Sequence, residues 1–187
     1  ITAGFGRVAP FSELSYAEID AVTKVDALAV AKILKAFSSR IFSNDNFYIA
    51  VMGSISGLIS SPLFSTYGAS KAYVCKLIES LNAELEFDGY TNRILNVSPG
   101  SLKGTSFNGG KTDIEVLSGL SNEIIKRMFA RETLYIPDFD VFGKVLRKKK
   151  PDVIISSGAA VAVPFFYLGK LFGVKTIYLE VFDRIDA

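Results

Sequence analysis

The hydrophobic positions of this chain follow two periods, one typical of helices and one typical of buried strands. Apolar residues recur every three or four positions over about residues 16–40 and again over about 65–86, which predicts two long helices that each bury one face. Ser15 and Glu18 form a capping box, so the first helix is expected to begin directly after Ser15. A third helical pattern covers about residues 116–130.

Apolar runs of strand length lie between and after these helices. "FYIAVMGS" (47–54) and "RILNVS" (93–98) predict two buried strands, and "DVIISS" (152–157) and "KTIYLE" (175–180) predict two more. The last two flank a helical pattern at 158–173 and therefore predict a β-α-β piece. Because strands that alternate with helices form parallel sheets covered by helices, the predicted fold class is α/β.

The segment 153–174 has a second interpretation as a membrane segment. It is almost long enough to span a bilayer, but Ser156, Ser157, Pro164 and Lys170 interrupt it. A buried strand followed by a helix is the favoured interpretation, and an interfacial or spanning segment is the alternative. The first ten residues contain no apolar run that is typical of a signal peptide. Membrane association is therefore kept as the less favoured expectation.

Composition narrows the chemistry that the chain can perform. Hydrophobic residues make up 49% of the chain, enough for a buried core, and a net charge of +2 gives no reason to expect nucleic acid. The run "RKKK" (147–150) closes a short predicted helix from about 141 and is interpreted as a solvated helix end. Cys75 is the only cysteine and histidine is absent, which excludes an internal disulfide, the usual zinc sites and histidine-dependent nucleophiles. A cytoplasmic location is expected, and acid–base chemistry must use Tyr, Lys, Asp or Glu.

Tyr67 and Lys71 form the strongest candidate for such chemistry. They are four positions apart on a predicted helix, so their Cβ atoms are expected about 5–6 Å apart on one face. An ammonium at that distance favours the phenolate, so we expect Lys71 to lower the pKa of Tyr67 from its ordinary value near 10 toward neutrality. Taken alone, Tyr-x-x-x-Lys is more often a surface pair. Ser54 and Pro99-Gly100, each at the end of a predicted strand, favour a site, because ligands bind at the carboxyl ends of parallel strands.

Four short motifs, in this order and spacing, resemble the short-chain dehydrogenase/reductase family over about residues 1–147. They are "TAG" (2–4), "MGSISG" (52–57), "YGASK" (67–71) and "SPGS" (98–101). The resemblance implies a partial Rossmann-like parallel sheet flanked by helices. It also implies an oxidoreductase that uses NAD or NADP to reduce a small carbonyl compound or to oxidise an alcohol.

The same resemblance implies a role for each site residue. Tyr67 is expected to be the general acid/base, Lys71 to lower its pKa and hold the nicotinamide ribose, and Ser54 to steady the substrate carbonyl. The residues expected to contact the cofactor are Ala3, Gly4, Tyr67, Lys71, Pro99, Gly100, Ser101, Leu102 and Thr105. The long helices over about 16–40 and 65–86 are expected to pair with those of a second copy, forming a homo-oligomer.

Three features depart from the pattern of the family. Asp26, in "KVDALA", takes the place of an asparagine, and a carboxylate can hold a water beside Lys71 but cannot donate an amide hydrogen bond. Thr105 comes one position later than usual, after Gly104. The glycine-rich turn that holds the pyrophosphate is expected before Thr2, and no residues of this chain before Thr2 supply it, so the family domain is expected to be truncated and the activity of this chain alone doubtful.

From about residue 149 the sequence instead resembles Alg14-like subunits of capsular-polysaccharide glycosyltransferases. That resemblance implies a membrane-recruiting partner of a sugar transferase, and it predicts two domains, 1–147 and 148–187. Three hypotheses follow: a short-chain oxidoreductase, a recruiting subunit for a glycosyltransferase, and a non-catalytic fusion fragment. The first is the favoured function.

Overall fold

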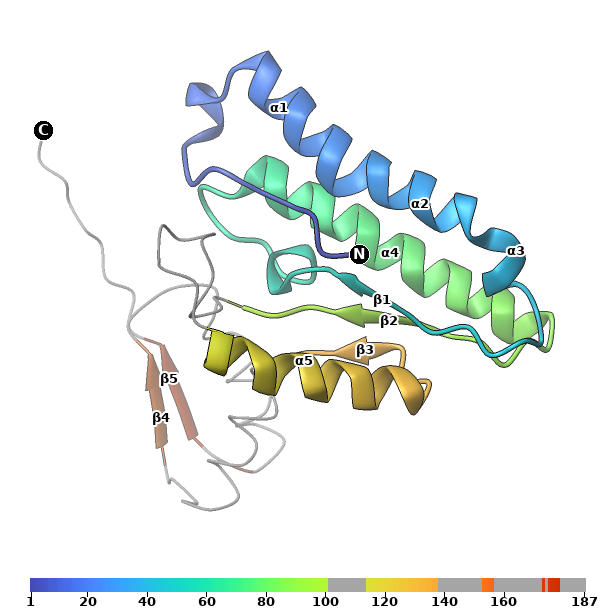
Figure 1. Ribbon diagram of the computed structural model, residues 1–187. Helices are drawn as coiled ribbons and strands as arrows, with labels where there is room; N and C mark the ends of the chain where they lie inside the picture. Colours follow the sequence, from blue (N-terminus) through green and yellow to red (C-terminus); the bar gives the residue numbers. More distant parts are fainter. Residues whose placement is uncertain (101–113, 138–152, 157–172, 174, 179–187) are drawn as a thin grey trace, which may run out of the picture. The chain divides into compact units, whose positions relative to one another are not determined.

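The computed structural model describes residues 1–100, 114–137, 153–156, 173 and 175–178 (Figure 1). The chain divides into two compact units, residues 1–137 and residues 138–187, and each is described by itself. The predicted boundary between residues 147 and 148 lies outside the described residues. The assignment of the two parts to two different families therefore stays a prediction.

Three parallel strands form the sheet of the first unit. β1 (Ile49–Met52) pairs with β2 (Ile94–Val97), and β2 pairs with β3 (Leu134–Tyr135), in the spatial order β1-β2-β3. The register places Ile49 opposite Ile94 and Met52 opposite Val97. Both strands predicted in this unit are confirmed. With helices on its flanks, this parallel sheet also confirms the predicted α/β class and its partial Rossmann-like form.

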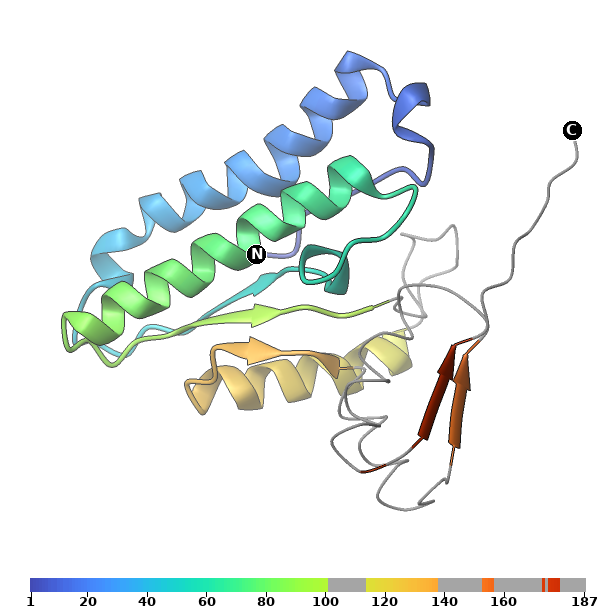
Figure 2. The ribbon, with the colours of Figure 1, turned by 180° about the vertical axis from the view of Figure 1, so that it is seen from behind.

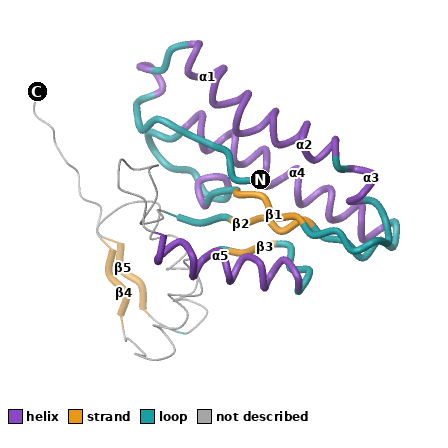
Figure 3. The backbone as a smooth tube through the Cα atoms, viewed as in Figure 1, coloured by secondary structure: helices purple, strands orange, loops and turns teal. Residues whose placement is uncertain are grey.

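Helices cover both faces of the sheet, as Figures 1 and 3 show. One face carries α1 (Tyr16–Val22), η2 (Thr23–Ala29), α2 (Val30–Ala36), α3 (Ser38–Ile41) and α4 (Ser65–Phe87). The opposite face carries α5 (Ile114–Phe129), and the view from behind in Figure 2 shows the same three layers. Two short 3-10 turns, η1 (Phe11–Glu13) and η3 (Ile55–Gly57), precede α1 and follow β1.

Alternate residues of β2 supply the two apolar cores. Ile94 belongs to a cluster between the sheet and the helices of the first face, together with Val30, Leu34, Ile41, Val51, Val74, Ile78 and Leu85. Leu95 and Val97 point the other way and join Tyr135, against which Leu120, Ile124 and Met128 of α5 pack. Because successive side chains of a strand face opposite sides, a strand buried on both faces reads as a continuous apolar run.

The first long helix is less regular than its sequence pattern predicts. The capping box is confirmed: Ser15 Oγ accepts from the backbone N–H of Glu18 at 3.2 Å, and the Glu18 carboxylate accepts from the backbone N–H of Ser15 at 2.8 Å. The middle of the helix, η2, is π-helical, and the chain leaves the helical path at Phe37 before α3. A π-helical turn widens the helix while its buried stripe continues, so the apolar period does not reveal it.

The sequence pattern missed β3. No strand was predicted between residues 98 and 152, yet Leu134 and Tyr135 form a strand of two residues. Asn96 N donates to Thr133 O at 3.0 Å, and Ser98 N donates to Tyr135 O at 2.8 Å, which attaches the segment to β2. Two residues are too few for any periodicity to appear.

The second unit contains a parallel strand pair. β4 (Val153–Ser156) pairs with β5 (Lys175–Tyr178), with Val153 opposite Lys175 and Ser156 opposite Tyr178. Both strands were predicted, whereas the helices predicted over about 141–150 and 158–173 lie outside the described residues. Among the helices that the structure does describe, none is long and apolar enough to cross a membrane.

One buried amide ties the amino end of the sheet to the helical layer. Asn92 is 1% exposed, and its Nδ2 donates to the carbonyl oxygens of Arg40, Ile41 and Ser43 at 3.2, 3.1 and 2.9 Å. Its Oδ1 accepts from the backbone N–H of Phe47 at 3.1 Å. The end of α3 and the approach to β1 are thus held by one side chain.

Arg131 reinforces the same corner from the far end of the chain's first unit. It has a positive φ of 60°, and its Nη1 donates to Phe47 O at 2.7 Å and to Asn92 Oδ1 at 2.9 Å. Its Nη2 donates to Asn46 Oδ1 at 2.9 Å, and its guanidinium lies 4.2 Å from the centroid of the Tyr48 ring. Charge-assisted bonds of this kind are stronger than neutral ones.

Replacing Asn92 with alanine is expected to lower the free energy of unfolding by about 2–4 kcal/mol, because several buried backbone groups then lack a partner. Urea unfolding of the purified protein measures the loss. Asn46→Ala is the matched control, since it removes one exposed hydrogen bond to Arg131. Equal losses in the two variants would contradict a structural role for the buried amide.

Candidate active site

The carboxyl ends of β1 and β2 lie at one edge of the sheet and bring predicted site residues together. Ser54 follows β1, and Pro99 and Gly100 follow β2. Ile55 N donates to Pro99 O at 3.0 Å, so the two segments still run side by side beyond the strands. This edge is where ligands bind in open parallel sheets.

Ser54 is held firmly in this position. Its side chain is buried and caps η3, with Oγ accepting from the backbone N–H of Ser56 at 3.2 Å. A hydroxyl that accepts one hydrogen bond can still donate its own proton. The Ser54 hydroxyl lies near enough to the Tyr67 phenol to influence its pKa, so the two predicted catalytic residues are neighbours.

Tyr67 lies in the first turn of α4, with its ring half-buried between two neighbours. The Phe64 ring centroid is 5.6 Å away. On the other side Gly6 comes so close that a Cβ added there would lie 2.7 Å from Tyr67 Cδ2. The absence of a side chain at Gly6 is therefore a condition for the position of the ring.

The expected lowering of the pKa of Tyr67 is wrong for this structure. Burial raises the pKa of the phenol above its ordinary value of 10.0, and the neighbouring Ser54 hydroxyl, a potential hydrogen-bond donor, opposes that increase. The nearby Asp26 and Cys75 raise it further. The prediction failed because spacing along a helix gives the distance to Lys71, whereas burial and the other charges depend on tertiary packing.

Lys71 is one turn further along α4 and is 3% exposed. Its Nζ donates to Met52 O at 3.1 Å, lies 3.8 Å from Asp26 Oδ2, and lies 5.7 Å from the centroid of the Tyr67 ring. Burial lowers the pKa of this ammonium, and the negative charge of Asp26 opposes the decrease. The predicted approach of Lys71 to Tyr67 on one helix face is present, but the lysine also contacts a carboxylate.

Asp26 is completely buried on η2, opposite Lys71. Its Oδ1 accepts from the backbone N–H of Phe5 at 3.0 Å, and its Oδ2 has no hydrogen-bond partner. Burial raises the pKa of this carboxyl, and the charge of Lys71 is the strongest influence that opposes the increase. Asp26, which takes the place of the family's asparagine, therefore forms a buried ion pair with Lys71.

The first residues of the chain pass directly beside this pair. Ile1 N donates to Ala50 O at 2.7 Å, and Met52 N donates to Ile1 O at 2.9 Å, so residue 1 runs along β1. Ala3 and Gly4 follow and are exposed. A Cβ added at Gly4 would lie 2.8 Å from Lys71 Nζ, so the backbone there approaches the ammonium closely.

The structure thus brings Ser54, Tyr67, Lys71 and Asp26 together, with Gly4 beside Lys71. Pro99 and Gly100 lie at the same edge of the sheet, and Ala3 precedes Gly4 in the chain. Ser101, Leu102 and Thr105 lie outside the described residues.

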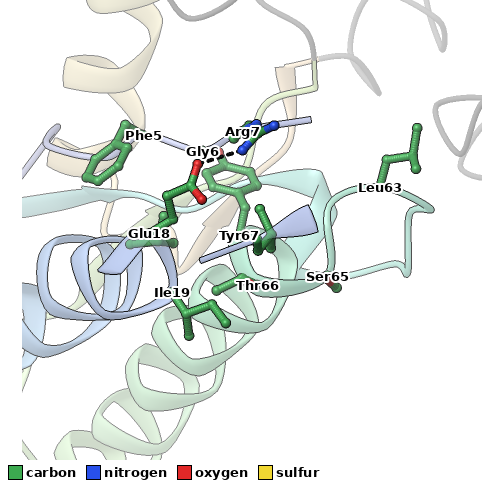
Figure 4. A pocket seen from close by; sticks show the side chains of 11 residues that line it. Phe5, Gly6, Arg7, Glu18, Ile19, Leu63, Ser65, Thr66 and Tyr67 are labelled. Atoms are coloured by element: carbon green, nitrogen blue, oxygen red, sulfur yellow. Dashed lines mark hydrogen bonds and ion pairs between the residues drawn. The ribbon is translucent and has the colours of Figure 1, made fainter. Parts of the chain in front are cut away.

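Sequence reasoning missed a cavity of about 100 Å³ on one side of Tyr67, which Figure 4 shows. Apolar side chains dominate its lining, and Arg7 Nη1 forms an ion pair with Glu18 Oε1 at 2.8 Å at its margin. The lining includes Phe5, Gly6, Leu14, Ile19, Val22 and Leu63. These residues come from a loop, from α1 and from the segment before α4, so no single sequence motif identifies them.

Among the described residues, no group of three or more Cys, Asp or Glu side chains is arranged to hold a metal ion. Cys75 is a buried free thiol whose Sγ lies 3.7 Å from Ser98 Oγ, beneath the site.

The sequence profile of the family described as "short chain dehydrogenase" matches residues 1–115. This match covers more than half of the chain, and the chain belongs to that family. The first of the two resemblances is thereby confirmed. The match ends before residue 149, so the resemblance to Alg14-like subunits stays a prediction. A comparison with curated proteins finds no match.

Solved structures share the same fold at low sequence identity. A short-chain dehydrogenase/reductase from Burkholderia phymatum in complex with NAD is 21% identical with a TM-score of 0.61, and the alignment covers 80% of this chain and 64% of that one. An alcohol dehydrogenase from the archaeon Thermococcus sibiricus, complexed with 5-hydroxy-NADP, is 21% identical with a TM-score of 0.59, covering 72% and 59%. A short-chain dehydrogenase from Sphingobium yanoikuyae in complex with NADPH is 21% identical with a TM-score of 0.58, covering 84% and 66%. The chain thus spans about three-fifths of the length of these structures.

Replacing Lys71 with methionine is expected to make the protein less stable as the pH rises. Without the ammonium, the buried Asp26 carboxyl loses the main influence that lowers its pKa. A carboxyl with a raised folded-state pKa adds stability below its unfolded value, and this stability is lost as the pH rises through the folded value. We expect a loss of about 3–5 kcal/mol in the free energy of unfolding at neutral pH and a smaller loss in acid.

Urea unfolding from acid to neutral pH measures this dependence. The matched control is Lys76→Met on the same helix, because the Lys76 side chain is 75% exposed and pairs with an exposed glutamate, Glu79. A loss in Lys71→Met that stays constant with pH would show that the two buried groups are not coupled.

Proposed function

We propose that this chain carries the acid–base site of an oxidoreductase that interconverts a small carbonyl compound and an alcohol with NAD or NADP. Family membership supports the class of reaction. The observation that carries the proposal is the proximity of the Ser54 and Tyr67 hydroxyls at the sheet edge, one helical turn from a buried lysine. A hydroxyl pair of this kind suits a carbonyl oxygen, which accepts hydrogen bonds and then a proton.

Tyr67 is the proposed proton donor and Ser54 the group that orients the substrate. The raised pKa of Tyr67 keeps the phenol protonated near neutral pH, which suits transfer of its proton to the oxygen of a carbonyl that is being reduced. Ser54 donates a hydrogen bond to the same oxygen. Alcohol oxidation needs the phenolate instead, and its rate therefore increases with pH up to the pKa of Tyr67.

The residues around Lys71 fit the nicotinamide-ribose end of such a cofactor. The exposed backbone of Ala3 and Gly4 runs beside Lys71 Nζ, at a distance that a side chain at position 4 would fill. When bound, the cofactor supplies or accepts the hydride. Lys71 and Tyr67 would hold its ribose hydroxyls, and Pro99 and Gly100 would border the ring, with Ser101, Leu102 and Thr105 next along the chain. The similar solved structures that contain NAD, 5-hydroxy-NADP or NADPH support this choice of cofactor.

Two further properties belong to the same proposal. The only cysteine is free and buried, which suits a reducing cytoplasm. Pairing of two copies through the long helices is supported by large apolar side chains exposed on them, including Leu28, Ile33, Phe37 and Tyr73.

Replacing Tyr67 with phenylalanine is expected to reduce the rate of carbonyl reduction by about 10²–10⁴-fold, because the proton donor is removed. NADH and NADPH consumption is followed with a panel of small aldehydes and ketones, and cofactor fluorescence measures binding. Tyr73→Phe is the matched control, since Tyr73 lies on the same helix with its ring exposed. A Tyr67→Phe protein that binds cofactor and reduces substrate at the rate of the control would overturn the proposal.

For residues 149–187 we keep a second candidate, a segment that recruits a glycosyltransferase partner to a membrane, as in Alg14-like subunits. The parallel pairing of β4 with β5 agrees with the strands predicted for this segment, and the candidate itself rests on the sequence resemblance. We expect the protein to float with vesicles of anionic phospholipid. The double variant Phe165→Ser/Phe166→Ser is expected to stay in solution. Unmodified protein that remains in solution would contradict this candidate.

A further inference from the structure

The buried pair of Asp26 and Lys71 is not a well-bonded salt bridge. Asp26 Oδ2 lies 3.8 Å from Lys71 Nζ, which is longer than a hydrogen bond, and this oxygen has no other partner. Both side chains are almost completely buried, at 0% and 3% exposure. An unsatisfied carboxylate oxygen at such depth is costly unless a neighbouring charge compensates it.

The pair is fixed from both sides. Asp26 is held by the backbone N–H of Phe5, and Lys71 is held by the carbonyl of Met52 at the end of β1. Gly4 closes over the ammonium. The carboxylate on η2 and the ammonium on α4 therefore face each other without freedom to separate, while Tyr67 lies on the same helix as the ammonium.

The titratable groups around this ammonium are few among the described residues. Asp26 faces it from η2, and Tyr67 and Cys75 accompany it on α4. From the end of β1 it meets only neutral groups, the carbonyl of Met52 and the hydroxyl of Ser54 near the phenol. Asp26 is thus the one carboxylate among these neighbours, and it acts on both Lys71 and Tyr67.

We propose that Asp26 is a positioning residue that holds the Lys71 ammonium in a buried ion pair and opposes its charge at the Tyr67 phenol. A negative charge beside the ammonium cancels much of the field that the phenol experiences, since the pair acts as a dipole rather than as a free cation. A neutral side chain of the same shape at position 26 removes this opposing negative charge from the phenol. The catalytic meaning of this inference rests on the proposed function, but the electrostatic coupling does not.

The test is a titration of Tyr67 by the ultraviolet absorbance of its phenolate. Subtracting the titration of a matching Tyr67→Phe protein isolates this residue from the seven other tyrosines, since the chain has 8. In Asp26→Asn we expect the midpoint of Tyr67 to move to lower pH by about one pH unit or more, as is typical for removal of one nearby charge. Asp20→Asn is the control, because Asp20 is exposed and pairs with exposed Lys24, and it is expected to move nothing.

A midpoint that is unchanged or higher in Asp26→Asn would overturn the inference. If the amide variant does not fold, Asp26→Ser provides the same neutralisation with a smaller side chain.

These measurements need no turnover and therefore separate this inference from the proposed function. A lowered midpoint without any Tyr67-dependent reduction would reject the function alone. Tyr67-dependent reduction without a lowered midpoint would reject this inference alone. Where both hold, the amide variant is also expected to oxidise alcohols about tenfold faster near neutral pH, because lowering the midpoint by about one pH unit multiplies the phenolate fraction about tenfold.

Discussion

The parallel register of β1 and β2 decides where every candidate residue of the site lies. Because both strands run in the same direction, the residues that follow them, Ser54 on one and Pro99-Gly100 on the other, emerge at one edge. The α4 helix packs across this strand pair and brings Tyr67 and Lys71 to that edge with its first turns. The chemistry proposed here depends on this geometry before it depends on any single side chain.

Much of this arrangement could be predicted from the sequence, because it follows from patterns that repeat along the chain. Long periodic helices and apolar strands were predicted because burial repeats along them, and the motif residues Ser54, Tyr67 and Lys71 were found through their spacing. The strand β3 was not predicted because two residues are too few to show a hydrophobic period. The π-helical η2 was not predicted because its buried stripe continues that of the neighbouring helices. The direction in which the pKa of Tyr67 moves was predicted wrongly, because it depends on burial and on charges from other elements.

Asp26 shows how a single substitution can change the energetics of a site without changing its geometry. With a neutral amide at position 26, the buried ammonium of Lys71 would have no carboxylate beside it. The carboxylate compensates the ammonium, and both groups tolerate their burial because of each other. Stability and proton affinity are thus linked at one contact, and neither property can be tuned there without altering the other.

The corner formed by Asn92, Arg131 and Asn46 has a consequence for how this sequence can diverge. These side chains share partners: Asn92 donates to Ser43 O, and Arg131 donates to Phe47 O and to Asn46 Oδ1. A single exchange leaves a donor or an acceptor unmatched, whereas paired exchanges can restore the match. Among distant relatives, these positions should therefore covary, and the amino end of the sheet should diverge in correlated steps while its solvent-facing neighbours drift independently.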